Sequence, residues 1–250
     1  TLYMIKKIAG KLLKSLGYKV LPISFWEAFR SDIHGDAIFQ EIFNKCQPFT
    51  VTSPEKMYGL YQAVNYVIQH NIDGDFVECG VWRGGSSMLI AHALLSQNVQ
   101  DRPIYLYDTF EGMSAPTEFD VTFGDKKAED GWQDEYQYKA EEEGVWQNMQ
   151  STKYPKSMIR FVKGKVEDTI PKNTPEKIAL LRLDTDWYES TYHELTHLFP
   201  LLSKHGVLII DDYGHWQGAR KAVDQYFGEN NIQILLNRMD YSGRMAIKQQ

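Results

Sequence analysis

The sequence predicts an α/β fold, with a seven-stranded and mostly parallel sheet that helices cover on both faces. Apolar runs of strand length alternate with helix-like stretches, which is the βαβ order of a parallel sheet. Runs such as 207–210 are almost continuously apolar, as strands buried on both faces are. The last run follows Ser242-Gly243, so we expect it to form a hairpin and to lie antiparallel. The seven runs are 76–81, 104–107, 158–162, 178–183, 207–210, 232–235 and 244–248.

Composition and charge exclude several classes of protein. The 250 residues are 43% apolar and 24% charged, which suits a chain that buries a full core. The net charge of −6 argues against a nucleic-acid binder held by phosphate contacts. Because no apolar run is long enough to cross a membrane and no cleavable leader is seen, we expect a cytoplasmic protein without stable membrane insertion. Cys46 and Cys79 form no C-x-x-C pair, and we expect both to be buried and reduced.

The N-terminal segment has a charge pattern of its own. Residues 1–20 contain five lysines and no acid, and their apolar residues recur at helical spacing. We expect a basic amphipathic helix, within an N-terminal helical extension over 1–50 that precedes the main domain at 51–250. Such a helix could rest on an anionic membrane, but it more often packs on its own domain or on a second subunit. We therefore expect a homodimer or a higher homo-oligomer.

A second unusual segment is acidic and rich in aromatic residues. Residues 111–150 contain eleven acids and three lysines, with tryptophan, tyrosine and phenylalanine spread among them. A solvated, disordered loop would be poor in aromatic residues. We expect a folded insertion that acts as a lid, although a surface excursion without a role is the alternative.

The first strand runs into a glycine-rich turn, 78–87, which is followed by a helix over 88–95. Glycines let a ligand approach the backbone, and the free N–H groups at a helix start attract an anionic group. The turn therefore favours a nucleotide-like ligand, although its glycines could serve helix–strand packing alone. Its G-x-x-x-G-G spacing differs from the G-x-G-x-x-G dinucleotide fingerprint, which disfavours a pyrophosphate. Asp108, after the second strand, is placed to accept hydrogen bonds from both ribose hydroxyls.

Four carboxylates follow two strands that we expect to be neighbours. Asp184 and Asp186 come after 178–183, and Asp211 and Asp212 come after 207–210. Because neighbouring strands lie about 4.8 Å apart, Asp184, Asp211 and Asp212 could share one cation. Oxygen ligands without cysteine indicate magnesium, or manganese or calcium in its place. The alternative is that the acids cap helices, which accounts for one acid at each strand end but not for four.

Histidines offer two further hypotheses. His193, Glu194 and His197 form a literal H-E-x-x-H, the helical zinc motif of metalloproteases. A zinc hydrolase is a remote alternative, because the leucines of this helix form an apolar stripe roughly opposite the two histidines. His215 follows the acidic pair, where it could assist proton transfer, contact an acceptor, or anchor its loop as a hydrogen-bond donor.

Five motifs together resemble the macrocin O-methyltransferase family of S-adenosylmethionine-dependent sugar O-methyltransferases, which act on deoxysugars of macrolides and related natural products. They are ECGVWRGGS (78–86), YDTFEG (107–112), GKVEDT (164–169), LDTDWYEST (183–191) and DDYGHWQGA (211–219). The resemblance covers roughly 50–248. It implies a Rossmann-like class I methyltransferase fold, with a methyltransferase domain over 51–250 that carries the lid insertion at about 111–150.

The resemblance also implies which residues hold the cofactor. Glu78 and Gly80 would line its methionine end, with Arg83 and Ser86 nearby, and Asp108 would hold its ribose. Gly164 and Val166, with the lysine between them, would flank the adenine. The implied closing segment over the cofactor contains Thr52 and Ser53.

The remaining roles concern the cation and the acceptor. Asp184, Asp211 and Asp212 match the family's magnesium ligands and Asp186 matches its general base, although Asp184 and Asp186 could exchange these two roles. A bound cation lowers the pKa of a sugar hydroxyl, and a nearby carboxylate can then take the proton. The residues that we expect around the acceptor are Trp187, Tyr188, Tyr213 and His215.

Two other functions are compatible with these residues. A catechol-like small molecule could replace the sugar, because both present a diol that a metal can chelate. A non-catalytic scaffold that binds S-adenosylmethionine is the alternative from another class, and it would need no divalent ion. The set of four aspartates argues against the scaffold.

Overall fold

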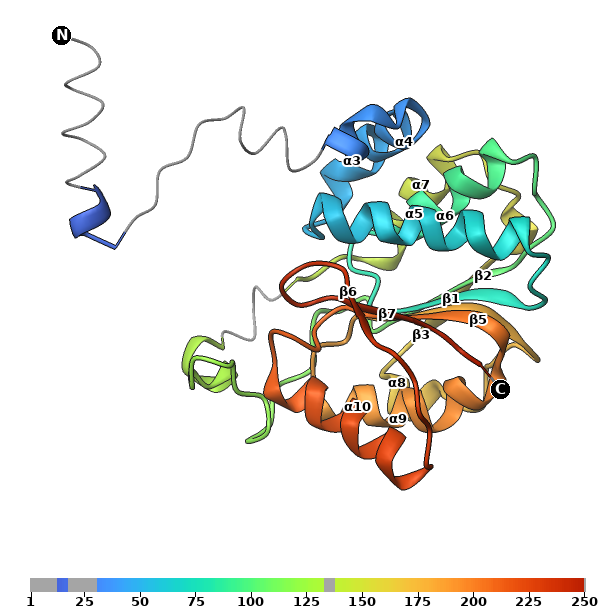
Figure 1. Ribbon diagram of the computed structural model, residues 1–250. Helices are drawn as coiled ribbons and strands as arrows, with labels where there is room; N and C mark the ends of the chain where they lie inside the picture. The colour runs from blue at the N-terminus through green and yellow to red at the C-terminus, as the bar shows by residue number, and fades with distance from the viewer. Residues whose placement is uncertain (1–12, 18–30, 133–137, 250) are drawn as a thin grey trace, which may run out of the picture. The chain divides into compact units, whose positions relative to one another are not determined.

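The computed structural model describes residues 13–17, 31–132 and 138–249, and it confirms the α/β fold with a seven-stranded sheet (Figure 1). The strands are β1 (Asp75–Cys79), β2 (Ile104–Asp108), β3 (Ile159–Lys163), β4 (Ile178–Leu183), β5 (Leu202–Ile210), β6 (Asn237–Arg238) and β7 (Arg244–Ile247). Their order in the sheet is β3-β2-β1-β4-β5-β7-β6. The first five pair in parallel, and β7 is antiparallel to β5 and β6, so the antiparallel last strand is confirmed.

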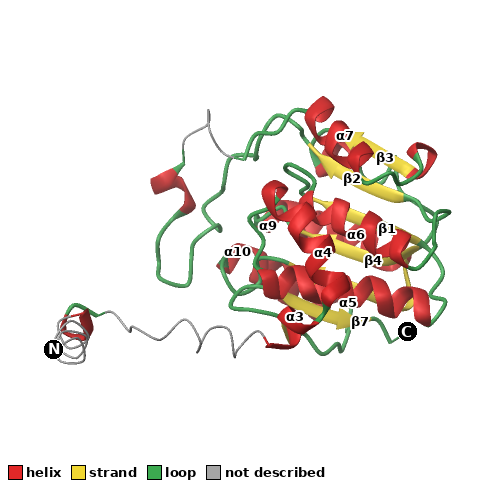
Figure 2. Cartoon of the chain, turned by 90° about the horizontal axis from the view of Figure 1, so that it is seen from above, coloured by secondary structure: helices red, strands yellow, loops and turns green. Residues whose placement is uncertain are grey.

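Helices cover both faces of this sheet. The helices of the described residues are α3 (Ser31–Gly35), α4 (Ala37–Cys46), α5 (Pro54–Gln69), α6 (Gly85–Ser96), α7 (Glu142–Ser151), α8 (Val166–Thr169), α9 (Tyr188–Leu198) and α10 (Gln217–Glu229), with short 3-10 turns η1 (Gln47–Phe49), η2 (Ala128–Gly131), η3 (Lys156–Met158) and η4 (Phe199–Leu201). Helices α5, α6 and α7 lie on one face, and α8, α9 and α10 lie on the other (Figures 1 and 2). The central strands are therefore covered twice, as their apolar runs predict.

Six of the predicted strands overlap observed strands, and the run 232–235 does not. This prediction was wrong, because the segment forms no regular secondary structure and pairs with no strand. The β6–β7 register, in which Asn237 lies opposite Met245, carries 232–234 past the end of β7. Ile232 and Ile234 still pack against the core, which explains the apolar pattern that suggested a strand.

The chain divides into two compact units, residues 1–40 and 41–250. In the first unit, the Asp36 carboxylate accepts a hydrogen bond from the Phe39 backbone N–H at 2.9 Å and caps the start of α4. The predicted basic helix over 1–20 lies outside the described residues except for 13–17. The predicted limits of the extension and of the main domain stay predictions. No helix in the described parts of the chain is long and apolar enough to cross a membrane.

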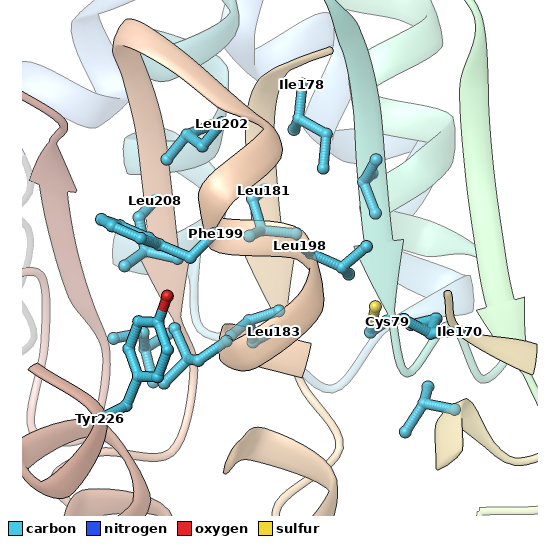
Figure 3. Packing of buried hydrophobic residues seen from close by; sticks show 14 of the residues in the cluster. Cys79, Ile170, Ile178, Leu181, Leu183, Leu198, Phe199, Leu202, Leu208 and Tyr226 are labelled. Atoms are coloured by element: carbon cyan, nitrogen blue, oxygen red, sulfur yellow. The ribbon is translucent and has the colours of Figure 1, made fainter. Parts of the chain in front are cut away.

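The core on the α9 and α10 side of the sheet is built from the central strands (Figure 3). Leu181 and Leu183 of β4 and Leu208 of β5 are almost fully buried there, together with Leu198 of α9. On this face Cys79 is also buried, and both Cys46 and Cys79 are free thiols, as expected. This packing fixes the positions of the strands whose carboxyl ends carry the aspartates.

Leu181→Ala tests the packing of this core. Leu181 has no exposed surface, so the substitution should lower the free energy of unfolding by about 2–5 kcal/mol through lost apolar contacts and a cavity. Leu235, with 75% of its surface exposed, gives the matched control, and Leu235→Ala should change it by about 0.5 kcal/mol or less. Urea unfolding of both variants measures the difference, and equal effects would contradict the described core.

Candidate active site

A cavity of about 1340 Å³ lies at the carboxyl ends of the parallel strands. Loops after β1, β2, β4 and β5 contribute to its wall, as ligand sites in open parallel sheets do. Segment 49–52 before α5 and parts of the acidic insertion complete the wall. The sequence-predicted residues that line it are Thr52, Glu78, Gly80, Ser86, Asp108, Gly164, Val166, Asp184, Asp186, Trp187, Asp211, Asp212 and His215.

The glycine-rich turn brings the end of β1 against the end of β4. Gly80 has φ +82°, and a Cβ at this position would overlap the carbonyl oxygen of Asp184. Gly84 has φ +87° and is the N-cap of α6. The turn thus needs glycine at both positions, and the first two residues of α6, Gly85 and Ser86, line the cavity.

Asp108 holds this turn in place from the end of β2. Its Oδ2 accepts hydrogen bonds from the backbone N–H groups of Val81 at 2.7 Å and Trp82 at 2.9 Å. Its Oδ1 accepts one from the N–H of Phe110 at 2.8 Å. The Thr109 hydroxyl also donates to Oδ1, at 3.4 Å. Each carboxylate oxygen can accept two hydrogen bonds, so a ribose hydroxyl would bind Asp108 at Oδ1, in place of this longer contact.

A buried arginine joins carboxylates from three strands. Arg182 of β4 is 1% exposed. Its Nη1 donates to Glu78 Oε1 and to Asp184 Oδ2, both at 2.7 Å, and its Nη2 donates to Asp211 Oδ1 at 2.6 Å. Nη2 also donates to Thr52 Oγ1 at 3.3 Å. A buried arginine that lost these partners would be costly, so the guanidinium fixes the ends of β1, β4 and β5 relative to one another.

Lys56 of α5 supplies a second buried cation. Its ammonium donates to Asp211 Oδ2 and to the Asp211 carbonyl oxygen at 3.2 Å. Both oxygens of the Asp211 carboxylate therefore carry a cationic partner, Lys56 on Oδ2 and Arg182 on Oδ1. Burial alone would lower the pKa of Lys56, but Asp211, Asp212 and Asp184 reverse this and raise that pKa, so the side chain stays charged.

The aspartates at this edge of the sheet provide more carboxyl groups than Arg182 and Lys56 can balance. Carboxylate oxygens of Asp184, Asp211 and Asp212 lie within 4.8 Å of one another. Burial raises the pKa of Asp184 and of Asp212, and neighbouring carboxylates raise both further. Asp212 Oδ2 is buried and has no hydrogen-bond partner in the described structure. An unpartnered oxygen beside two other carboxylates fits an oxygen-ligated divalent cation.

Asp186 lies beside this group in a left-handed backbone conformation, with φ +66°. Its Oδ1 accepts a hydrogen bond from the indole N–H of Trp216 at 3.1 Å. Burial and the Asp184 carboxylate raise the pKa of Asp186 to about 7. A carboxylate with such a pKa can accept a proton near neutral pH.

Aromatic rings form the wall next to Asp186. Trp187 is buried, and its indole N–H donates to the Ser114 carbonyl oxygen at 2.7 Å. Its ring packs edge to face against Trp216 at 5.2 Å and against Trp132 at 6.1 Å. His215 packs on Trp216, with ring centroids 4.7 Å apart, and also lines the cavity. The described part of the acidic insertion thus contributes Ser114 and Trp132 to this wall.

Four of the sequence-predicted residues do not line the cavity. Ser53 caps α5 by accepting from the Lys56 N–H at 3.2 Å, and its hydroxyl donates to Asp240. Arg83 is exposed and lies over the rings of Phe49 and Trp82. The hydroxyls of the two tyrosines are directed to neighbouring helical residues, Tyr188 to Gln225 and Tyr213 to Asp224, at 2.7 Å each.

The zinc-type motif is divided between the two sides of α9. Glu194 is fully buried and accepts from Thr185 Oγ1 at 3.0 Å, while the His193 ring contacts the Ile170 carbonyl oxygen at 3.1 Å. His193 and His197 lie next to each other, with ring centroids 4.5 Å apart. Within the described residues, the one group with metal-ligand geometry is the set of three aspartates, so the histidine pair has no third ligand there.

Sequence reasoning missed three residues of this site: Arg182, Lys56 and Trp216. A charged residue inside the apolar run 178–183 was the available signal for Arg182, because a buried charge requires partners. Trp216 belongs to the motif at 211–219, but the resemblance to the family gave this residue no role. Lys56 gave no signal, since its place depends on how α5 packs across the strand ends.

Comparisons with known proteins agree with this architecture. The family model described as Macrocin-O-methyltransferase (TylF) matches residues 45–247. The chain is 34% identical over 243 residues to demethyldecarbamoylnovobiocin O-methyltransferase of Streptomyces niveus, covering 94% of this chain and 92% of that protein. It is 32% identical over 240 residues to 8-demethyl-8-(2,3-dimethoxy-alpha-L-rhamnosyl)-tetracenomycin-C 4'-O-methyltransferase of Streptomyces olivaceus, covering 93% of this chain and 88% of the relative. The solved structure of the O-methyltransferase NovP superposes with a TM-score of 0.72 at 31% identity, over 81% of this chain and 83% of that one.

Glu194→Gln tests the buried carboxyl behind the site. Burial raises the folded-state pKa of Glu194 well above its usual value, so its contribution to stability is complete below the unfolded pKa and is lost as pH rises. Glutamine does not ionise, so the variant does not lose stability in this way as pH rises. The difference in unfolding free energy, variant minus wild type, should therefore increase by about 1.4 kcal/mol per pH unit above pH 5.

Urea unfolding at several pH values measures this difference. Glu143→Gln, which removes an exposed carboxylate on α7, is the control for the loss of one acidic group. A constant difference between Glu194→Gln and wild type from pH 5 to pH 8 would show that Glu194 is ionised in the folded protein.

Proposed function

The chain belongs to the macrocin O-methyltransferase family, and we propose that it transfers a methyl group from S-adenosylmethionine to a hydroxyl group of a sugar in a natural product. The observation that carries the proposal is one cavity in which a glycine-rich turn faces a group of aspartates. The names of the two relatives specify O-methylation of demethyldecarbamoylnovobiocin and of an 8-demethyl-tetracenomycin C that carries a dimethoxy-rhamnosyl group. Both cover most of this chain.

The glycine-rich turn is the proposed cofactor site. S-adenosylmethionine supplies an activated methyl group on a sulfonium. Gly80 and the start of α6 admit the methionine end close to the backbone, and the carboxylate of Glu78 favours its ammonium group. Asp108 is proposed to hold the ribose, and Gly164 and Val166 to flank the adenine. Glu78, Gly80, Asp108, Gly164 and Val166 all line the same cavity, which supports the assignment.

Asp184, Asp211 and Asp212 are the proposed ligands of a divalent cation, magnesium being the expected ion. The unpartnered Asp212 Oδ2 and the excess of carboxylates support it. A divalent cation there supplies positive charge that lowers the pKa of a nearby hydroxyl. The chain itself holds the three carboxylates at the ends of β4 and β5, so the site is organised before any ligand arrives.

Asp186 is the proposed general base. The Trp216 indole holds the carboxylate at the cavity wall, and a pKa of about 7 suits proton removal from a hydroxyl. Trp187, Trp132 and His215 are the proposed acceptor contacts. Flat aromatic walls exclude water, which favours in-line transfer to the acceptor oxygen over side reactions.

Asp186→Asn tests the proposed base. The amide cannot take the proton, so kcat for methylation of a deoxysugar glycoside should fall about 10²–10⁴-fold. Affinity for S-adenosylhomocysteine, measured by calorimetry, should change less than about threefold, because Asp186 is not among the proposed cofactor contacts. Asp224→Asn, at an exposed position of α10, is the control. Wild-type kcat in the Asp186 variant would remove Asp186 from the mechanism.

Removal of divalent ions tests the cation. Methyl transfer should fall at least about tenfold in excess EDTA and recover on addition of Mg²⁺, and binding of S-adenosylhomocysteine should persist throughout. Methyl transfer by the Asp212→Asn variant should not recover when Mg²⁺ is added. Full activity in EDTA, with a metal-free protein verified by elemental analysis, would show that the aspartates act without a cation.

A further inference from the structure

Lys56 is a buried cation that reaches the aspartates from a different part of the fold. It belongs to the first turns of α5, whereas the carboxylates follow β4 and β5. The side chain is about 9% exposed, and its stem passes close to Gly243, where a Cβ would lie 3.2 Å from the Lys56 Cγ. Its ammonium contacts Asp211 through both a carboxylate and a carbonyl oxygen. The lysine is therefore a built part of the site.

The position of this ammonium conflicts with that of a cation. Lys56 binds Asp211 Oδ2, and Asp211 is one of the three aspartates that bring carboxylate oxygens within 4.8 Å of one another. The other Asp211 oxygen is already bonded to Arg182. A divalent cation that uses either oxygen of Asp211 must therefore approach a positively charged side chain, and like charges on one carboxylate repel strongly in a partly buried site.

We propose that Lys56 is an internal counter-ion that competes with the divalent cation for Asp211, so that it stabilises the cation-free protein and weakens cation binding. The inference rests on the cation site of the proposed function. Without a metal, Lys56 and Arg182 offset part of the repulsion among Glu78, Asp184, Asp186, Asp211 and Asp212. When the cation binds, the Lys56 ammonium can withdraw into the cavity, which the residue lines.

The alternative role for Lys56 has the opposite signature. If the lysine only oriented Asp211 as a ligand, its replacement would weaken cation binding. If it competes, replacement strengthens binding, because one positive charge is removed from the immediate surroundings of the ion. The direction of the change in affinity distinguishes the two roles.

Calorimetric titration with Mg²⁺ tests the proposal on wild type, Lys56→Gln and Lys56→Arg. Glutamine keeps a hydrogen-bond donor for Asp211 and removes the charge, whereas arginine keeps the charge. We expect Lys56→Gln to bind Mg²⁺ about tenfold more tightly than wild type, and Lys56→Arg to bind within about threefold of wild type.

Thermal unfolding gives a readout independent of activity and of calorimetry. In EDTA the Tm of Lys56→Gln should lie below that of wild type, and saturating Mg²⁺ should raise it by more than it raises the wild-type Tm. A Lys56→Gln protein that folds only with Mg²⁺, and not with KCl at equal ionic strength, supports the proposal. Equal or weaker Mg²⁺ binding by Lys56→Gln overturns it.

The same titrations separate this inference from the proposed function. If wild type binds no Mg²⁺ but Lys56→Gln does, the lysine masks the site and the inference is supported. If neither protein binds Mg²⁺, the inference is overturned, and binding of S-adenosylhomocysteine then shows whether the methyltransferase proposal survives without a cation.

Discussion

Mutual repulsion among carboxylates at one edge of a sheet is the constraint on which the rest of the site depends. The fold gathers Glu78 from β1, Asp184 and Asp186 after β4, and two further aspartates after β5. Arg182 offsets part of this repulsion by donating hydrogen bonds to a carboxylate at the end of each of the three strands. Since the guanidinium is planar and its donors are fixed, it also sets the spacing of the strand ends. The strand order, with β1, β4 and β5 side by side, is what allows one arginine to do this.

The same arginine lies between the proposed cofactor site and the proposed cation site. Its Nη1 is shared by Glu78, which we assign to the cofactor, and by Asp184, which we assign to the cation. The two sites are thus parts of one hydrogen-bonded unit, organised by the chain before either ligand binds. Such pre-organisation suits a reaction in which the protein mainly has to align an acceptor oxygen with an activated methyl group.

Much of the fold could be predicted from the sequence, because strands that are buried on both faces consist of nearly continuous apolar residues. The run 178–183 corresponds to β4 residue for residue. The segment 232–235 misled, since packing against the core produces the same apolar pattern without strand pairing. For the site, acids at strand ends were predictable because parallel strands end at one edge. The side chains that point away from the cavity could not be predicted. Ser53 caps a helix, and the Tyr213 hydroxyl is directed to Asp224. These directions depend on tertiary partners that no local pattern encodes.

The contact at Gly80 has a consequence for how the enzyme can change. With no room for a Cβ between the β1 turn and the Asp184 carbonyl oxygen, the turn and the aspartate loop touch backbone to backbone. The separation of the proposed cofactor site from the aspartate loop is then set by the main chain and not by side-chain rotamers. Evolution or directed mutagenesis can therefore remodel the aromatic wall and the acidic insertion for new acceptors while the reaction geometry at the sheet edge is inherited unchanged.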